Sequence, residues 1–233
     1  MPSPETLARA TWSSTFRRFE PGPFTLFGPV TLSVQDWTAP RRGQPQMFNQ
    51  PFLEWFTRTR PRTLVLIFLP VSIFFVCAGA VMGWSPLASC ALFGGGVMLW
   101  TLIEYLMHRF VFHLTPRGRL GVFFAYLIHG VHHAFPEDRR RWLIPPIVSV
   151  PVAIVILSVL RLLAGSAAFP IFAGVAFGYL AYDLLHYAGH AGSLRGRMAH
   201  YLRQHHMTHH YRLPETRFGV SSPLWDRVFG TFR

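Results

Sequence analysis

The chain has 233 residues, of which 51% are hydrophobic and only 14% are charged, and its formal net charge is +12. A composition this apolar argues against an ordinary soluble domain and indicates a membrane protein of a single-domain size. All 22 basic residues are Arg and many of them flank apolar segments, which favours anionic lipid headgroups over nucleic acid as the partner.

The N-terminal part of the chain is predicted to be a cytoplasmic or interfacial segment, residues 1–60, ahead of a membrane domain at 61–233. Pro and Gly occur throughout residues 1–60, so most of the segment is expected to be irregular. Phe48, Phe52, Leu53 and Phe56 are predicted to form one face of a short interfacial helix.

Four segments are long enough to cross a bilayer, which takes about 20 apolar residues. They are residues 63–84, 87–107, 143–163 and 167–187. The turns between the first and second and between the third and fourth are short, so the fold class predicted is an all-α membrane protein with four transmembrane helices in two hairpins. Cys77 and Cys90 lie in apolar stretches and are predicted to be buried thiols without a disulfide.

The hairpin arrangement places the end of the second span, the start of the third and the end of the fourth on one side of the membrane. Arginines gather on that side at residues 58–62, 117–119, 139–141 and 195–212, whereas the two opposite loops contain none. The positive-inside rule therefore predicts a cytoplasmic helical cap on this side. The apolar segment 120–128 is too short to span and is expected to lie on or re-enter the membrane.

Ten histidines form four clusters that fall on this same side, and imidazole is the commonest metal ligand in proteins. The spacing His-x-x-His-His places side chains at i, i+3 and i+4, on one face of a helix. His186 and His190 are an i, i+4 pair, whereas His108 and His113 are five apart and need a bent helix end or different roles. The ten candidate ligands and catalytic residues are His108, His113, His129, His132, His133, His186, His190, His206, His209 and His210.

Ten imidazoles are too many for one ion, so the count favours two ions with about five nitrogens each, and His200 and His205 are left over. The spacing does not identify the metal, because imidazole suits Fe, Zn, Cu and Ni. The absence of a His-Glu-x-x-His motif argues against a zinc protease. A non-catalytic zinc- or haem-binding membrane protein stays open as an alternative from a different class.

Two carboxylates lie on the predicted spans close to the histidines, where a lone charge is costly. Glu104 precedes His108 by four residues and Asp183 precedes His186 by three. Each is a candidate to accept the outer N–H of a metal-bound imidazole. The alternative is that either carboxylate pairs with an arginine.

The histidine boxes resemble those of the fatty acid hydroxylase/sterol desaturase superfamily of integral-membrane di-iron oxygenases, and within it the chain looks most like the fatty acid 2-hydroxylases. The resemblance covers roughly residues 46–233. Three segments around the boxes carry it: HGVHHAFPEDRRRWLIPP at 129–146, YDLLHY at 182–187 and RFGVSSPLWDRVFGTF at 217–232.

The resemblance implies an O2-dependent monooxygenase in which the ten histidines hold two Fe ions and a lipid acyl chain is hydroxylated at C2. Zinc can occupy such a site in purified protein. Residues 1–107 contain no His and so lack the haem signature of the b-type cytochrome domain fused to many relatives. Electrons are therefore expected from a separate carrier: a b-type cytochrome, a ferredoxin or a reductase. Desaturation, or hydroxylation of a carotenoid or sterol, stays open within the superfamily.

The expected location is a bacterial inner membrane with the histidine-rich face in the cytoplasm, because the chain uses only Arg as a basic residue and shows no eukaryotic fusion. Several aromatic residues are candidates to line an acyl channel, although packing or lipid contact explains each of them as well. They are Phe74, Phe75, Trp100, Phe123, Phe124 and Phe177.

Overall fold

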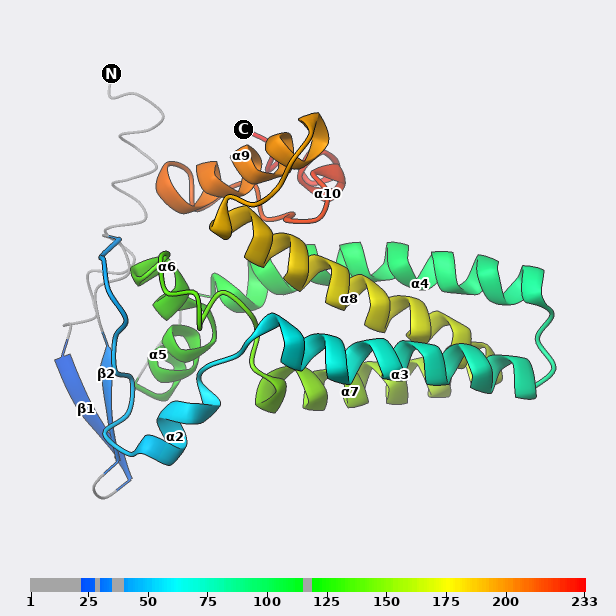
Figure 1. The fold of residues 1–233 in the computed structure, drawn as a ribbon, viewed down its shortest axis with the longest axis horizontal. Helices are drawn as coiled ribbons and strands as arrows, with labels where there is room; N and C mark the ends of the chain where they lie inside the picture. Colours follow the sequence, from blue (N-terminus) through cyan, green and yellow to red (C-terminus); the bar gives the residue numbers. More distant parts are fainter. Residues whose placement is uncertain (1–21, 28–29, 35–39, 115–118) are drawn as a thin grey trace.

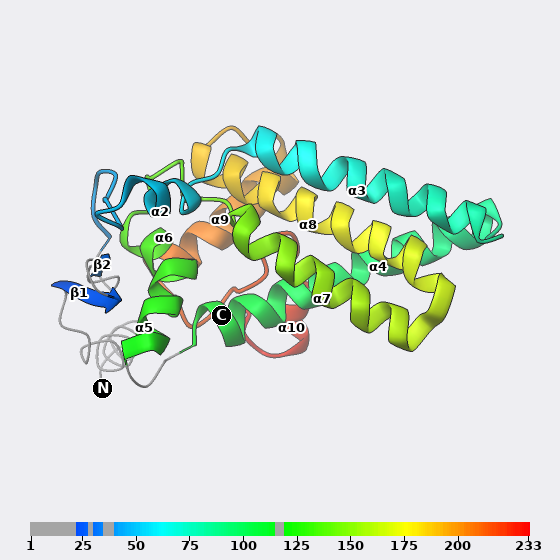
Figure 2. The same ribbon diagram turned by 90° about the horizontal axis from the view of Figure 1, so that it is seen from below.

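The computed structural model describes residues 22–27, 30–34, 40–114 and 119–233, and most of them are helical (Figure 1). Four long helices run side by side in both views (Figure 2). Three of the four begin with a proline in the first turn, where its missing N–H costs no hydrogen bond. The four helices coincide with the apolar segments predicted from the sequence. They are α3 (Pro61–Val81), α4 (Pro86–Leu106), α7 (Pro146–Ala164) and α8 (Ala168–Ala191).

Three continuous helical stretches in the described residues are long and apolar enough to cross a membrane: Pro61–Val81, Pro86–Phe112 and Pro146–Ala191. The third has 46 residues and includes both α7 and α8, which run in opposite directions on either side of a 3-10 turn at Gly165–Ala167. These stretches make the chain a membrane protein. Cys77 and Cys90 are free, but both are exposed, so the prediction that they are buried was wrong.

Helix α8 lies at the centre of the bundle and meets α4 through two glycines. A Cβ atom on Gly174 would lie 2.0 Å from the Phe93 carbonyl oxygen, and one on Gly96 would lie 2.0 Å from the Ile171 carbonyl oxygen. Only glycine permits this backbone approach, which resembles the small-residue packing common between membrane helices. The contact fixes where α8 lies along α4, and therefore where the ends of both helices meet the histidine-bearing segments.

Replacing Gly174 by Ala should force the α4 and α8 backbones apart. Overpacking of this kind costs about 3 kcal/mol, which corresponds to a fall of roughly 10 °C in the apparent melting temperature of the detergent-solubilised chain. Gly94→Ala is the matched control, because a Cβ atom there meets nothing within 4 Å. Equal melting temperatures for the two variants would contradict the close approach.

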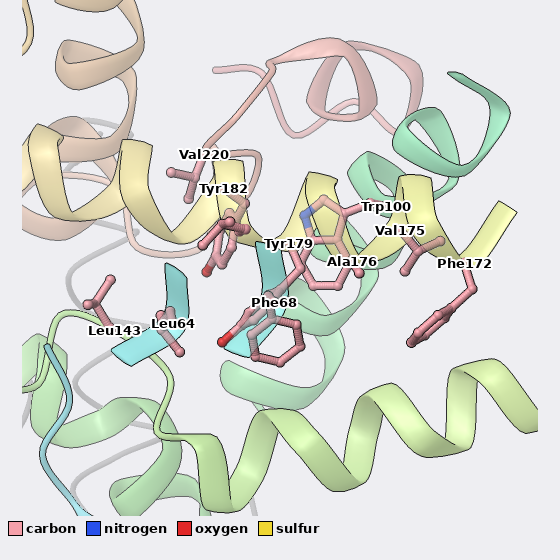
Figure 3. Packing of buried hydrophobic residues seen from close by; sticks show 11 residues of the cluster. Leu64, Phe68, Trp100, Leu143, Phe172, Val175, Ala176, Tyr179, Tyr182 and Val220 are labelled. Atoms are coloured by element: carbon pink, nitrogen blue, oxygen red, sulfur yellow. The ribbon is translucent and has the colours of Figure 1, made fainter. Parts of the chain in front are cut away.

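The core of the bundle is a cluster of aromatic and aliphatic side chains between α3, α4 and α8 (Figure 3). The Tyr179 ring contacts Phe68 of α3 at a centroid distance of 4.5 Å and Trp100 of α4 at 5.2 Å. Val220 from the C-terminal segment belongs to the same cluster, so this core joins the bundle to the end of the chain.

Short helices gather at the end of the bundle where α3 and α7 begin and α4 and α8 end (Figures 1 and 2). We call this set the cap. It places the histidine-bearing helix ends on one side, as predicted. Its helices are α2 (Pro51–Phe56), α5 (Arg119–Ala125), α6 (Val131–Ala134), α9 (Arg197–Tyr211) and α10 (Leu224–Val228), with π-helical turns at Met107–Phe112 and Tyr126–Gly130.

The N-terminal segment departs from the prediction in two ways. It contains an antiparallel hairpin of β1 (Gly22–Phe27) and β2 (Val30–Val34), so the fold is mostly helical and not all-α. The short helix α2 forms, but Phe48 precedes it and is buried against Phe123, whereas Phe52 is exposed. The expected single apolar face is therefore divided between the cap core and the surface. Two further predictions lie outside the described residues. They are the irregular structure expected at residues 1–21, 28–29 and 35–39, and the position of Arg117 in a loop on the cap side.

Candidate metal centre

The ten predicted histidines come from five helical elements and meet inside the cap. His108 lies in the π-helical turn Met107–Phe112 that follows α4, His113 comes directly after this turn, and His129 lies in the turn Tyr126–Gly130. His132 and His133 are on α6, His186 and His190 are on the last turns of α8, and the remaining three are on α9.

The π-helical turn resolves the five-residue spacing between His108 and His113. Its hydrogen bonds run from i to i+5, and the His113 N–H donates to the His108 carbonyl oxygen at 3.2 Å. Residues five apart therefore lie on the same side of the turn, which an α-helix would not allow. The two imidazole rings are 5.1 Å apart between centroids. The chain therefore meets the five-residue spacing with a π-helical turn, which was not among the expectations from the sequence.

The structure sorts the ten histidines into two groups of five. In each group, one ligand atom of every residue lies within 4.8 Å of those of the other four. Group 1 is His108, His113, His129, His133 and His209. Group 2 is His132, His186, His190, His206 and His210.

Each His-x-x-His-His motif serves both groups. The i, i+4 pair His129 and His133 belongs to group 1, and the intervening His132 points to group 2. On α9 the assignment is reversed, because His206 and His210 belong to group 2 and His209 belongs to group 1. The groups adjoin: the rings of His133 and His210 stack at a centroid distance of 4.2 Å.

Nitrogen–nitrogen distances within the groups fit a shared metal ion. In group 1, His129 Nε2 lies 3.2 Å from His108 Nε2 and 2.9 Å from His133 Nε2. In group 2, the Nε2 atoms of His132 and His186 are 3.1 Å apart. Two nitrogens that each lie about 2.1 Å from one ion, at right angles, would be about 3.0 Å apart.

Two further properties fit a metal. Both ring nitrogens of His210 and Nε2 of His209 are buried and have no hydrogen-bond partner in the described part of the chain, which is costly unless something else binds them. Burial, reinforced by the neighbouring imidazoles, also lowers the pKa of His129, His132 and His206 well below the usual value. These rings are therefore neutral at pH 7, and the neutral imidazole is the form that binds metal.

Backbone carbonyls orient the histidines from outside the groups. His108 Nδ1 donates to the Phe218 carbonyl oxygen at 2.5 Å, and His209 Nδ1 donates to the Thr216 carbonyl oxygen at 2.7 Å. Such bonds fix the tautomer, so that Nε2 points inward with its lone pair available.

Two buried carboxylates hold the 216–221 segment that supplies these carbonyls. Asp226 accepts from the N–H groups of Phe218 at 2.8 Å and Gly219 at 2.9 Å, and Glu104 accepts from the N–H groups of Val220 at 2.6 Å and Ser221 at 2.8 Å. The sequence suggested that Glu104 accepts the outer N–H of His108, and this was wrong. The Phe218 carbonyl oxygen accepts it, and Glu104 holds the backbone segment that contains Phe218.

Asp183 also differs from the prediction. Its Oδ2 accepts from the Ile144 N–H at 3.3 Å, and its Oδ1 has no hydrogen-bond partner in the described residues. The carboxylate thus joins α8 to the start of α7 and is not bonded to His186. Among the residues that the structure describes, Asp183 makes neither the favoured pairing with histidine nor the alternative pairing with arginine.

The two leftover histidines lie outside both groups. His200 is exposed and contacts Gln204. His205 is fully buried, with Nε2 at 3.1 Å from Asp226 Oδ2, so it belongs to the network that holds the 216–221 segment. Burial by itself raises the pKa of Asp226, but hydrogen bonds, the first of them with His205, hold that pKa below its usual range.

Asp226 is a residue that the sequence analysis missed. It is fully buried and accepts four hydrogen bonds, including one from Thr231 Oγ1 at 2.7 Å. Its position in the tail RFGVSSPLWDRVFGTF was visible, but nothing in the pattern indicated that its carboxylate caps backbone N–H groups eight residues earlier.

A narrow apolar cavity in the bundle has one end next to the metal-binding groups, although no histidine lines it. Two lining residues lie at this end: the Phe112 ring stacks on His129 of group 1 at 5.1 Å, and the Tyr182 ring stacks on His186 of group 2 at 5.9 Å. Of the six aromatic residues suggested from the sequence, only Trp100 lines this cavity. Its other aromatic lining residues are Phe68, Phe172 and Tyr179.

The chain is similar to known hydroxylases over most of its length. A family model described as fatty acid hydroxylase matches residues 93–231. A dihydroceramide fatty acyl 2-hydroxylase from Arabidopsis thaliana is 36% identical over 188 residues, which cover 80% of this chain and 79% of the relative. A ceramide very long chain fatty acid hydroxylase from Saccharomyces cerevisiae is 36% identical, over 82% of this chain and 50% of the relative.

A solved structure agrees with these matches. The structure of full-length scs7p, in which only the hydroxylase domain is visible, superposes on this chain with a TM-score of 0.74. The two sequences are 35% identical, and the match covers 78% of this chain and 70% of that chain.

Proposed function

The chain belongs to the fatty acid hydroxylase family as a fatty acid 2-hydroxylase-like membrane enzyme, and from this we propose that it hydroxylates C2 of a lipid acyl chain with O2. In this reaction a C–H bond becomes C–OH and the second oxygen atom leaves as water, for which a separate carrier supplies two electrons and the solvent supplies two protons. The observation that carries the proposal is the position of the two five-histidine groups at the end of an apolar cavity.

The ten histidines are proposed to hold two iron ions, one in each group. The inward Nε2 atoms, the short nitrogen–nitrogen distances and the neutral rings support this assignment. When bound, the iron supplies O2 activation and oxidation of the C–H bond. Imidazole also binds zinc well, so zinc in purified protein would not by itself exclude iron in the cell.

The chain's own part in the reaction is to position the acyl chain and to exclude water. The walls of the cavity are almost entirely apolar, so a hydrocarbon chain is favoured in it over polar molecules. Phe112 and Tyr182 lie between the cavity and one histidine of each group. A carbon atom next to these two rings would be one aromatic side chain away from each group, which supports reaction at a fixed position near one end of the acyl chain.

The relatives guide the proposed substrate class. The Arabidopsis name specifies a dihydroceramide fatty acyl group and position 2, and the Saccharomyces name specifies a ceramide very long chain fatty acid without a position. For this chain we propose an acyl lipid of the same general kind, presented from the membrane. Desaturation and the hydroxylation of carotenoids or sterols are the competing reactions, and no feature of the cavity favours them.

We further propose that α3, α4, α7 and α8 each span the membrane and that the cap is cytoplasmic. The loops at 82–85 and 165–167 carry no arginine, whereas the cap side carries many. Residues 61–233 would then form the catalytic domain and residues 1–60 a cytoplasmic or interfacial segment. A bacterial inner membrane fits this topology, and the electron donor, a b-type cytochrome, ferredoxin or reductase, would approach the same cytoplasmic face.

Mass spectrometry of hydrolysed lipids tests the proposal. Cells that express the chain, together with a competent reductase system, should contain 2-hydroxy fatty acids that cells with an empty vector lack. A hydroxyl group at another carbon, a new double bond, or a modified carotenoid or sterol with unchanged acyl chains would reject C2 hydroxylation.

A further inference from the structure

A second cavity lies at the border between the cap and the bundle, and no histidine of the two groups lines it. It has a volume of about 860 Å³ and lies among α2, the first turns of α3 and the first turns of α7. A smaller hollow of about 370 Å³ adjoins it and shares Thr59, Arg60, Arg62 and Arg140. We call the two together the arginine cleft.

Two chain segments far apart in sequence build the arginine cleft. The Thr59 N–H donates to the Arg140 carbonyl oxygen at 2.8 Å, which sets residues 58–62 beside residues 139–141. The buried Arg141 guanidinium binds Glu54 of α2 at 2.5 Å and also pairs with Asp138. These bonds fix the backbone, so the neighbouring arginines are held together by the fold.

Carboxylates neutralise only part of the positive charge of the cleft. Arg58 pairs with Glu54 at 2.6 Å, but no carboxylate of the described residues lies within 4.0 Å of Arg60, Arg62 or Arg140. Helices α3 and α7 also begin here, and the N-terminal ends of helices attract anions. Three unpaired guanidinium groups between two such ends suit a phosphate group.

An independent observation also indicates a ligand. Thr59 is only 4% exposed and lines both parts of the cleft, yet its Oγ1 has no hydrogen-bond partner in the described residues. A buried hydroxyl group without a partner is uncommon, because it loses its hydrogen bonds to water. A phosphate oxygen in the cleft would accept this hydrogen bond.

The remaining wall of the cleft is apolar and faces the bundle. Ile67 of α3 and Ile147, Val150 and Pro151 of α7 line it, and Trp55 of α2 is exposed beside it. Tryptophan is enriched at the level of lipid headgroups. The combination of a basic end and an apolar end matches a molecule with an anionic head and a hydrocarbon tail.

We propose that the arginine cleft binds a phospholipid, with its phosphate between Arg60, Arg62, Arg140 and the Thr59 hydroxyl group and its acyl chain along α3 and α7. This binding does not depend on the proposed hydroxylation. The site nevertheless adjoins the metal-binding groups, because Tyr187 lines the cleft and Trp142 contacts both Tyr187, at 5.1 Å, and His190, at 5.2 Å.

Native mass spectrometry of the full chain in detergent tests the proposal with three probes. They are phosphatidylglycerol, diacylglycerol with the same acyl chains, and inorganic phosphate. Phosphatidylglycerol should bind at a saturable site about tenfold more tightly than diacylglycerol, because only the former can use the guanidinium groups. Inorganic phosphate should not displace it at comparable concentration, since phosphate lacks the acyl chain.

Two variants that each remove three positive charges distinguish a specific binding site from non-specific electrostatic attraction between the cap and the lipid. The triple variant R60Q/R62Q/R140Q should lose most of the difference between the two lipids, whereas R195Q/R197Q/R212Q, which removes three exposed arginines elsewhere on the cap, should retain it. Thr59→Val preserves the side-chain shape and should weaken phosphatidylglycerol binding several-fold. This single variant still tests the proposal if the triple variant does not fold.

Three results would overturn the proposal. Equal losses in the two triple variants would mean diffuse charge attraction. Diacylglycerol binding as tightly as phosphatidylglycerol would leave only an apolar groove. Displacement of the lipid by an equal concentration of inorganic phosphate would assign the cleft to a free anion.

Discussion

His209→Ala should abolish acyl hydroxylation and lower the metal content of the purified chain. His209 is fully buried, belongs to group 1, and is oriented by the Thr216 carbonyl oxygen at 2.7 Å. Loss of a residue that merely orients a ligand already costs about 10- to 100-fold in metal affinity or activity, so loss of a ligand should cost at least about 100-fold. Metal analysis of the purified protein and lipid mass spectrometry measure the two effects.

Two comparisons make this result specific. His132→Ala removes a member of group 2 and should have an equally large effect, although His132 and His209 lie on different helices. His200→Ala removes an exposed histidine from the same helix as His209 and should leave both activity and metal content unchanged. Full activity in the His209→Ala variant would contradict the assignment of ten ligands.

Asp226→Ala should destabilise the C-terminal segment and, through it, the metal centre. The carboxylate is fully buried and accepts hydrogen bonds from Phe218, Gly219, Thr231 and His205. Removing this buried acceptor leaves its donors without partners, at a cost of about 1–3 kcal/mol for each buried donor. Because the Phe218 carbonyl orients His108, metal affinity should fall with stability, by about 10- to 100-fold. Thermal unfolding and metal titration measure the two losses.

A conservative substitution of Asp226 and the removal of a different carboxylate serve as controls. Asp226→Asn keeps the shape and part of the hydrogen bonding, so it should lie between the wild type and Asp226→Ala in both measurements. Glu215→Ala removes an exposed carboxylate from the same segment and should change neither. If Asp226→Ala unfolded more easily but bound metal as tightly as the wild type, the proposed link from Asp226 through Phe218 to His108 would be wrong.

The long helices were predictable because they depend on local composition. An apolar run of about 20 residues, bounded by proline or by short polar turns, specifies a helix without knowledge of its neighbours. The meeting of the ten histidines was also predictable, since polar side chains are costly at the ends of membrane spans and the hairpin arrangement brings these ends together. The hairpin at Gly22–Val34 was missed because Pro and Gly in its sequence indicate irregular structure as readily as a hairpin.

The partners of the buried carboxylates were not predictable. Glu104 and Asp183 lie one helical turn from a histidine in the sequence, which suggested contact with that histidine. Their actual partners are Ser221 and Ile144, 117 and 39 residues away. Only the tertiary packing of the C-terminal segment on α4, and of α7 on α8, creates these bonds. The π-helical turn at His108 was likewise not predictable, because a single turn is too short to produce a repeating pattern of apolar residues in the sequence.

The division of each His-x-x-His-His motif between the two groups has a consequence for the order in which metal is taken up. An ion bound by His129 and His133 also fixes the turn that carries His132, and the same holds for His209 and its neighbours on α9. The first ion would thus reduce the conformational freedom that the second must remove, so uptake should be positively cooperative. At limiting iron, a mixture of empty and fully loaded chains should outweigh singly loaded ones.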